Sequence, residues 1–399
     1  MNRKLWLVWT LCAVLPVAGW AVDPMAPPRA EALAVPSSVS EEPGLKTGPA
    51  EWHAGVTVGM SHDNNIALSQ TNREAAYIWT ISPEVTANLG NLKAGGGTGV
   101  AVNYRPTFFF FSSYNENNTV DQSASLKAQW VGAKLTLGVA QEYALTHGAV
   151  VEVGQRVRQD TFNTDLLAKY DFSEKTSVEV APRLTVQDSD EFVDSQDWGV
   201  DAFVNRQLSS KITGSIGGSA GYFSVENSAD QRYARGLARV VYELAEKVSI
   251  TAAGGVEYRE YTSSEPSTVT PVFGIAAVYR PTDKTTLSIE GHRREEPSVF
   301  TNDLNYVTMG VTAEVRQQLL QQYYVAVAGG YDNRYYSSTV SGQAANRTDN
   351  YFFIHPSAGT TFARHWSVSV YYEYQANDST QDGHNFVNNQ VGIEGSWRY

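Results

Sequence analysis

Apolar and polar residues alternate with a period of two along almost the whole chain from Trp52 to the C-terminus. In residues 177–186, for example, the even positions carry Val, Val, Pro, Leu and Val, and the odd positions carry Ser, Glu, Ala, Arg and Thr. The stretches 366–375 and 390–399 alternate in the same way. Because successive side chains of a β-strand point to opposite faces, the sequence predicts an all-β fold whose strands have one apolar and one polar face.

The apolar face of these strands has to meet either lipid or a protein core. After the first 21 residues no apolar run approaches the roughly 20 residues of a membrane-spanning helix, which excludes an α-helical membrane protein. Charged residues make up only 18% of the chain and aromatic residues 12%. Strands with lipid on one side and water on the other carry this pattern. A secreted β-sandwich or β-propeller is the structural alternative, but the chain shows no blade-length repeat.

Short and long connections alternate between the predicted strands. The short ones lie at 91–93, 131–133, 173–175, 209–210, 245–246, 281–283, 319–320 and 363–364. The long ones lie at 63–74, 112–118, 146–158, 187–195, 226–231, 261–266, 295–303, 337–350 and 377–385. Eight short and nine long connections make 17, hence 18 strands, and an even number brings both ends of the barrel to one side of the membrane. The sequence therefore predicts a transmembrane antiparallel β-barrel of about 18 strands.

The first 21 residues have the features of a secretory signal peptide. A basic pair at 3–4 precedes an apolar core at 5–18, and residues 19–21 supply the small side chains that a signal peptidase reads. We expect cleavage after Ala21. An uncleaved inner-membrane anchor is the alternative, although the core is short and a proline interrupts it. The single cysteine of the chain, Cys12, lies in this segment, which excludes a disulfide scaffold.

Residues 22–50 differ in composition from the rest of the chain. They hold six of the 15 prolines, with Ser, Glu and Ala between them. Such a segment buries too little apolar surface to offset the entropy of ordering it, so we expect a disordered periplasmic extension. A partner-binding arm is the alternative. The predicted organisation is a signal peptide at 1–21, this extension at 22–50 and an outer-membrane β-barrel at 51–399.

Composition also limits the partners and the chemistry. The 30 basic and 42 acidic residues give a formal net charge of −12, which argues against nucleic acid as a partner. None of the seven histidines forms a His-x-x-x-His pair, and none lies beside a serine flanked by glycines. The sequence thus predicts no enzyme, no metal site and no cofactor.

The polar faces of the predicted strands carry acidic and basic side chains in similar numbers. Assigning the apolar positions to lipid directs these charges, together with His292 and His355, into the lumen. The nineteen charged candidates are Glu84, Arg105, Glu142, Asp165, Glu179, Arg183, Asp201, Arg235, Arg239, Glu257, Arg259, Glu290, Arg294, Glu314, Arg316, Arg334, Glu373, Glu394 and Arg398. Charged groups keep their charge only where water or an opposite charge replaces the lost hydration. The set therefore lines a polar conduit or, in pairs such as Glu257 and Arg259, forms structural ion pairs.

The loop at 146–158 is one candidate for narrowing this lumen. An 18-stranded cylinder is wide enough for an aqueous channel unless loops fold inward. This loop comes third among the long connections, and inward-folding loops are common in porins. The constriction is therefore a hypothesis drawn from the position of this loop in the chain.

Aromatic side chains mark the predicted membrane interfaces. Trp130, Phe172, Trp366 and Trp397 lie on apolar faces next to short connections, where interfacial aromatic girdles occur. The outer-membrane lipid is thus an expected partner. The chain ends in an alternating strand that finishes on Tyr399, and this ending is similar to the C-terminal signal that the barrel assembly machinery recognises.

The predicted first hairpin carries a family resemblance. Its first loop contains Ser61-His62-Asp63-Asn64-Asn65-Ile66, and its second strand begins Tyr77-Ile78-Trp79-Thr80-Ile81-Ser82-Pro83-Glu84-Val85. This pairing of an Asp-Asn loop with an aromatic strand bearing Ser-Pro resembles outer-membrane β-barrel porins associated with exopolysaccharide operons. The motif spans about 35 residues, while the strand architecture extends over 51–399.

The resemblance implies a function and a location. It implies a non-enzymatic channel in the outer membrane of a Gram-negative cell, with a periplasmic N-terminus, that helps exopolysaccharide cross that membrane. Polysaccharide export components are then expected partners. The alternative is a general or substrate-selective porin for the uptake of small hydrophilic solutes.

Overall fold

The structure, a computed structural model, covers most of the predicted barrel. The described residues are 44–90, 97–244, 247–262, 267–298, 300, 303–320, 322–339, 345 and 347–399. The predicted signal peptide at 1–21 and residues 22–43 of the predicted extension lie outside them. The short connections predicted at 91–93 and 245–246 also lie outside the described residues.

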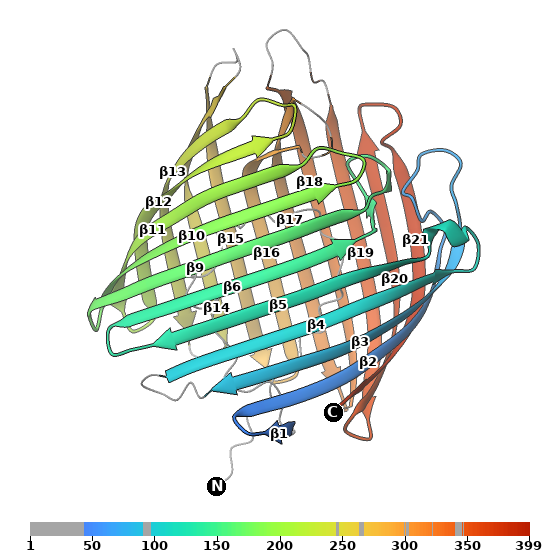
Figure 1. The fold of residues 1–399 in the computed structure, drawn as a ribbon, viewed down its shortest axis with the longest axis horizontal. Helices are drawn as coiled ribbons and strands as arrows, with labels where there is room; N and C mark the ends of the chain where they lie inside the picture. The colour runs from blue at the N-terminus through green and yellow to red at the C-terminus, as the bar shows by residue number, and fades with distance from the viewer. Residues whose placement is uncertain are drawn as a thin grey trace.

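Eighteen antiparallel strands form a closed barrel (Figure 1). They are β2 (Ala50–Asp63), β3 (Ala76–Gly90), β4 (Gly97–Phe111), β5 (Thr119–Val131), β6 (Leu135–Thr146), β9 (Gln159–Ser173), β10 (Thr176–Ser189), β11 (Ser195–Ser209), β12 (Ile212–Val225), β13 (Gln231–Leu244), β14 (Val248–Tyr261), β15 (Thr268–Thr282), β16 (Thr285–Pro297), β17 (Leu304–Leu319), β18 (Tyr323–Ser338), β19 (Thr348–Phe362), β20 (Trp366–Ser379) and β21 (Phe386–Arg398). Each strand pairs with its neighbours along the chain, and β2 pairs with β21 to close the sheet. The predicted fold class is confirmed.

Four short elements accompany these strands. The strand β1 (Leu45–Thr47) pairs with the start of β2. The prediction of a disordered extension up to residue 50 is therefore wrong at its C-terminal end, because a glycine turn folds residues 45–47 back onto the sheet. The 3₁₀-helix η1 (Asn115–Asn117) lies in the loop after β4, and β7 (Ala149–Val150) pairs with β8 (Gln155–Arg156) in the loop after β6.

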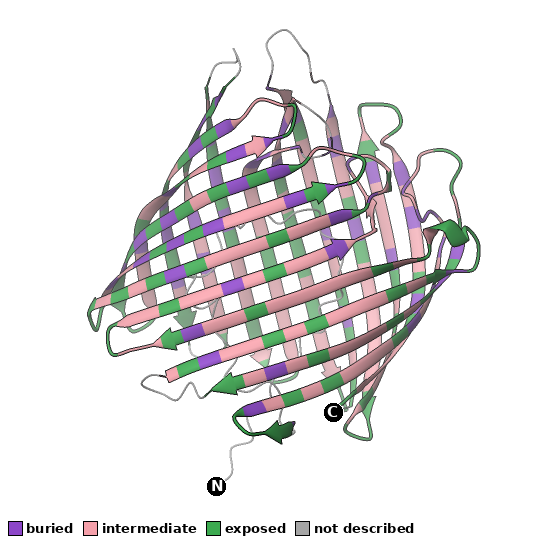
Figure 2. Cartoon of the chain, in the orientation of Figure 1, coloured by how far each residue is buried: buried purple, intermediate pink, exposed green. Residues whose placement is uncertain are grey.

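Exposed and less exposed residues alternate along the strands (Figure 2), and many of the exposed positions carry large apolar side chains. In β10, Val180 is 38% exposed, whereas the neighbouring Glu179 is 2% exposed. Some of the buried apolar side chains within the described residues form three small clusters, one of which contains Phe203, Leu237 and Val272. The strand ladders therefore hold this fold together more than any single apolar core. No helix in the described part of the chain is long and apolar enough to span a membrane.

The two ends of the barrel differ in the length of their connections. One end has the short turns between paired strands, and the other has the longer loops, in the order that the sequence predicts. We call these the short-turn end and the long-loop end. Both β1 and the C-terminal Tyr399 lie at the short-turn end, where Ala54 and Tyr399 exchange backbone hydrogen bonds of 2.8 and 3.2 Å (Figure 1).

Arginine substitutions in β10 test which face meets lipid. Val180 points outward and pairs with Ala202, the middle residue of β11. Val180→Arg is expected to cost about 2–4 kcal/mol, because it places a cation in hydrocarbon near the midplane. Thr185→Arg, on the inner face of the same strand, is expected to cost far less. Urea unfolding in lipid vesicles measures the free energy of unfolding of each variant. Equal decreases for the two variants would contradict the assignment of the two faces.

Candidate functional site

The structure places all nineteen predicted lumen residues on the strand face opposite the exposed aliphatic and aromatic side chains. Seven of them form a mostly buried polar network on β10, β11, β13 and β14: Glu179, Arg183, Asp201, Arg235, Arg239, Glu257 and Arg259. The other twelve lie on the remaining strands: Glu84, Arg105, Glu142, Asp165, Glu290, Arg294, Glu314, Arg316, Arg334, Glu373, Glu394 and Arg398.

Arg183 is the centre of one half of the network. Its Nη1 atom donates to both carboxylate oxygens of Asp201 at 3.0 and 3.1 Å, and its Nη2 atom lies 2.5 Å from the hydroxyl of Tyr233. Tyr233 in turn donates to Asp197 at 2.9 Å. The residue opposite Arg183 on β11 is Gly199, where a Cβ atom would lie 2.7 Å from the guanidinium carbon. The missing side chain lets the guanidinium lie flat against the wall.

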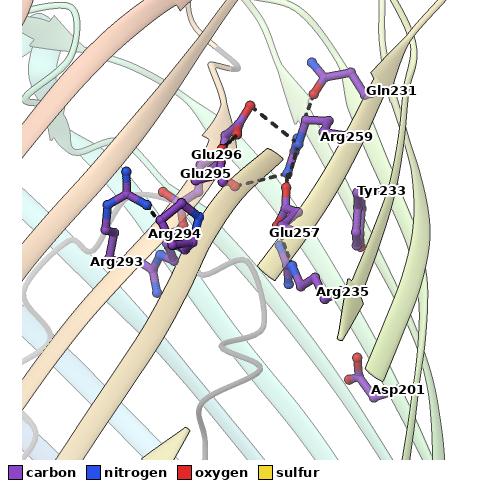
Figure 3. Close-up of polar contacts among 12 residues, drawn as sticks. Asp201, Gln231, Tyr233, Arg235, Glu257, Arg259, Arg293, Arg294, Glu295 and Glu296 are labelled. Carbon is purple, nitrogen blue, oxygen red and sulfur yellow. Dashed lines mark hydrogen bonds and ion pairs between the residues drawn. The ribbon is translucent and has the colours of Figure 1, made fainter. Parts of the chain in front are cut away.

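Glu257 is the centre of the other half (Figure 3). It is 0% exposed, and its carboxylate accepts from Arg235 at 2.5 Å and from Arg259 at 2.7 Å. Arg239, on the same strand β13 as Arg235, donates to Glu179 of β10 at 2.8 Å. Removing one partner of such a pair leaves an uncompensated buried charge, which is strongly destabilising. Of the two hypotheses for Glu257 and Arg259, the structural ion pair is the one that the geometry supports.

The strands β15 and β16 pair over only part of their length. Their ladder ends at Phe273 opposite Arg293, although β15 starts at Thr268 and β16 continues to Pro297. The side chain of Arg293 donates to the free carbonyl oxygen of Pro271. Beyond this point the tip of β16 contacts Arg259 and Tyr261 on the inner surface of β14 (Figure 3).

Glu295 anchors the tip of β16 to that inner surface. Its carboxylate accepts from the hydroxyls of Tyr261 at 2.9 Å and Thr270 at 2.6 Å. Arg259 donates to the backbone carbonyl of Glu295 at 3.1 Å, and Asn305 donates to its carboxylate at 3.2 Å. The polar contacts replace the missing strand ladder.

The sequence did not reveal this anchor. The prediction assigned residues 295–303 to a loop, but β16 extends to Pro297, so the start of that loop is wrong. Neutral polar residues such as Gln231, Tyr261 and Asn305 were not among the candidates. One signal was present in the sequence, because Glu295 and the next residue are both acidic, which breaks the alternation of a regular strand. In the structure both are buried.

The loop at 146–158 folds into the mouth of the barrel. The hairpin of β7 and β8 turns at Gly154, whose φ of +65° favours glycine. A Cβ atom on Gly154 would lie 3.4 Å from the carbonyl oxygen of Leu68 and 3.6 Å from that of Gly383. These residues belong to the loops after β2 and after β20, whereas the hairpin starts between β6 and β9. The loop therefore reaches across the long-loop end, as the constriction hypothesis expects.

A set of buried polar contacts, the Glu152 latch, holds the tip of this loop. The latch consists of Glu152, Ser298 and Arg347. The hydroxyl of Ser298 donates to the carboxylate of Glu152, and Arg347 donates to the Glu152 carbonyl oxygen at 2.7 Å. Arg347 is itself fixed by Asp349 at 2.5 to 3.0 Å and lies 4.5 Å from the ring centroid of Tyr336. Three separate loops thus meet at one point inside the mouth.

Burial shifts the pKa of Glu152 and of the neighbouring His384. It raises the pKa of Glu152 above its ordinary value of 4.5, and the hydrogen bond from Ser298 and the charges of Arg334 and Arg347 only partly oppose this shift. Burial also lowers the pKa of His384 below its ordinary value of 6.5. The docked loop therefore favours the neutral forms of both groups.

The ion-paired side chains elsewhere on the inner wall include more exposed ones. Lys127 and Glu142 form an ion pair at 3.8 Å with side chains 32% and 52% exposed, and Arg398 lies 3.8 Å from Glu84 with 46% and 28% exposed. Further contacts join His355 to Glu373 at 3.0 Å, His292 to Asp332 at 3.7 Å, and Arg316 to the ring of Tyr324 at 3.9 Å. Among the described residues no group of three or more His, Cys, Asp or Glu side chains could hold a metal ion.

These features define the class of the protein. A closed antiparallel barrel with an apolar exterior is the arrangement by which β-strands cross a bilayer, because every strand edge is paired. The chain is therefore an outer-membrane β-barrel, with a strand number in the range of channel-forming barrels.

Comparison with known proteins finds similarity to solved structures at low sequence identity. No protein-family model matches the chain, and no curated protein matches it in sequence. Among solved structures, OccK2 (OpdF) of Pseudomonas aeruginosa is 9% identical with a TM-score of 0.49, covering 88% of this chain and 97% of its own. OpdQ of the same species is 8% identical with a TM-score of 0.48, covering 88% and 99%. The outer membrane protein OpdK of P. aeruginosa is 8% identical with a TM-score of 0.45, covering 88% and 99%.

Breaking the latch is expected to widen the pore. Arg347→Ala removes the charged hydrogen bond to the Glu152 carbonyl oxygen. Such a bond is worth about 1.5–3 kcal/mol, which is more than ten-fold in the docking equilibrium of the loop. We expect a larger single-channel conductance in planar bilayers. Arg158→Ala is the matched control, since Arg158 pairs with Asp160 and Asp190 and not with the latch. An unchanged conductance of the Arg347 variant would contradict the role of the latch.

The raised pKa of Glu152 predicts a pH dependence. The docked loop binds the Glu152 proton more tightly than a released loop, so docking is most stable below the ordinary pKa of 4.5 and weakens as pH rises through the raised value. Conductance should therefore increase with pH across this window. Glu152→Gln is neutral at every pH and should remove this dependence, whereas an unchanged slope in that variant would assign it to other groups.

Proposed function

We propose that the protein is a channel for the uptake of small hydrophilic solutes across the outer membrane. The observation that carries this proposal is the loop at 146–158, which lies in the mouth of the barrel and is latched there through Glu152. An unobstructed 18-stranded barrel would be wide enough for an aqueous channel without size selection. A latched inward loop narrows such a channel to small solutes.

The charged wall supports a hydrated passage. Ion pairs such as Lys127 with Glu142 are partly exposed on the inner face, and they carry both signs of charge. Groups of this kind need water or a counter-charge around them. A wall of mixed charge gives modest selection between anions and cations, and water fills the space that the side chains leave.

The predicted orientation belongs to the same proposal. The short-turn end, which holds β1 and Tyr399, faces the periplasm, and the long loops face the outside. The C-terminal strand ending at Tyr399 is the segment that the barrel assembly machinery binds. The predicted signal peptide at 1–21 directs export, and the Pro-rich residues 22–43 then lie in the periplasm.

Exopolysaccharide export is the second candidate, and the resemblance of the first hairpin is the observation that favours it. A polymer chain passing through the barrel would require the latched loop to leave the mouth and to stay out during transport. The three loops joined by Glu152, Ser298 and Arg347 oppose that movement. The geometry therefore supports the uptake channel better, and non-enzymatic transport is common to both candidates.

Solute permeation and surface polymer distinguish the two functions. Proteoliposomes containing the purified protein should swell in sugars and amino acids, with rates that fall as solute size increases. The Arg347→Ala variant should admit larger solutes than the wild type, because its loop is released. A deletion strain should keep its surface polysaccharide. Loss of that polymer, together with no permeation in proteoliposomes, would overturn the uptake proposal in favour of export.

A further inference from the structure

Five consecutive hairpins, from β5–β6 to β15–β16, carry a lysine at the same position in the short turn that joins their two strands. These residues, which we call the lysine arc, are Lys134, Lys175, Lys211, Lys247 and Lys284, and each directly precedes the second strand of its hairpin. The carbonyl oxygen of each lysine accepts a backbone N–H from the next hairpin at 2.7 to 2.9 Å. The donors are Asp171, Gln207, Glu243, Arg280 and Gln318. Equivalent bonds place the five side chains at one level of the barrel.

The arc lysines have no evident role inside the protein. All five are exposed. Among the described residues, the lysines that form ion pairs are Lys127 and Lys169, and neither belongs to the arc. Glu174 and Asp283 share two of the turns without forming an ion pair with the neighbouring lysine in the described structure. Consecutive hairpins are two strands apart, so neighbouring lysines are separated by about 9–10 Å across the strands, with a further offset along them.

The arc lies at the edge of the apolar band. Outward side chains precede the lysines by three to five residues: Trp130, Phe172, Leu208, Leu244 and Tyr279, which are 37 to 64% exposed. Aromatic side chains at such positions sit at the level of lipid headgroups. Long lysine side chains extend from the end of an apolar surface into the same layer. The ammonium groups therefore reach the headgroup region at the short-turn end.

Charge is distributed unequally between the two ends of the barrel. The chain has a formal net charge of −12. Exposed acidic residues gather in the loops of the long-loop end: Glu116, Asp190, Glu191, Asp194, Glu226 and Asp382. An anion is repelled there and attracted by the lysine arc. The basic arc is thus a local feature of an otherwise acidic protein, and it faces one leaflet only.

We propose that the lysine arc binds the phosphate groups of anionic phospholipids in the leaflet at the short-turn end. A basic side chain near an anionic membrane surface favours an anionic headgroup by roughly five-fold. Five such groups in a row would hold a patch of anionic lipid against β5 to β16. This site is independent of what passes through the lumen, so it stands whether or not the barrel proves to be an uptake channel.

Spin-labelled lipids test the site directly. The protein is reconstituted at low salt in phosphatidylcholine vesicles that contain trace spin-labelled phosphatidylglycerol or phosphatidylcholine, and the motionally restricted fraction of each probe is measured. The wild type should select the phosphatidylglycerol probe by about two-fold or more, averaged over all lipids around the barrel. Lys175→Gln, Lys211→Gln and Lys247→Gln together should abolish most of this selection.

A matched triple variant controls for charge. Arg73→Gln, Arg158→Gln and Arg232→Gln also remove three positive charges, but from the long-loop end. This variant should keep the selection of the wild type. Electrophoretic migration before and after heating checks that each variant is folded. Absence of selection in the wild type, or equal loss in both variants, would overturn the proposal; in the first case an acidic protein is the remaining candidate partner for the arc.

Discussion

A backbone amide or carbonyl group in a bilayer needs a hydrogen-bond partner within the protein, and this requirement dictates the whole structure. The chain satisfies it by pairing each strand with two neighbours and by joining β2 to β21. Where the ladder between β15 and β16 stops, arginine side chains donate hydrogen bonds to backbone carbonyl oxygens. Arg293 donates to the free carbonyl oxygen of Pro271, and Arg259 donates to that of Glu295. The sheet thus bends inward at β16 while the carbonyl groups along its open edge find side-chain partners.

Closure creates an interior in which charge has to be paired. Small residues on β11 and β12 make room for this, since Gly199 lies opposite Arg183 and Gly221 lies opposite Tyr233. Long side chains then lie along the wall and pair across several strands, as Arg183 does with Tyr233 on β13. This network stiffens one side of the barrel. The mouth is controlled by separate contacts, in which the loop at 146–158 meets Ser298 and Arg347.

Most of the barrel could be predicted from the sequence because its rules are local. Alternation fixes which side chains share a face, so parity alone predicts that the nineteen charged residues lie opposite the exposed apolar side chains. The latch and the β16 tip depend on contacts between residues far apart in the sequence, which no sequence periodicity predicts. Ser298 and Glu152, for example, are 146 residues apart. The pairing of β1 was missed because the proline-rich composition of 22–50 outweighed three strand residues at its end. The family resemblance at 61–66 and 77–85 covers only the hairpin of β2 and β3. It therefore carries no information about the latched loop, which lies between β6 and β9.

The central claim is that the docked loop limits passage through the lumen, and a reversible cross-link tests it most directly. Glu152→Cys with Ser298→Cys introduces a thiol at each of two positions whose native side chains are in contact, in a chain whose single cysteine lies in the predicted signal peptide. Under oxidising conditions the disulfide holds the loop, and single-channel conductance should match that of the wild type. Reduction frees the loop without the native latch, and conductance should increase in the same bilayer. An identical conductance in the oxidised and reduced states would contradict the account.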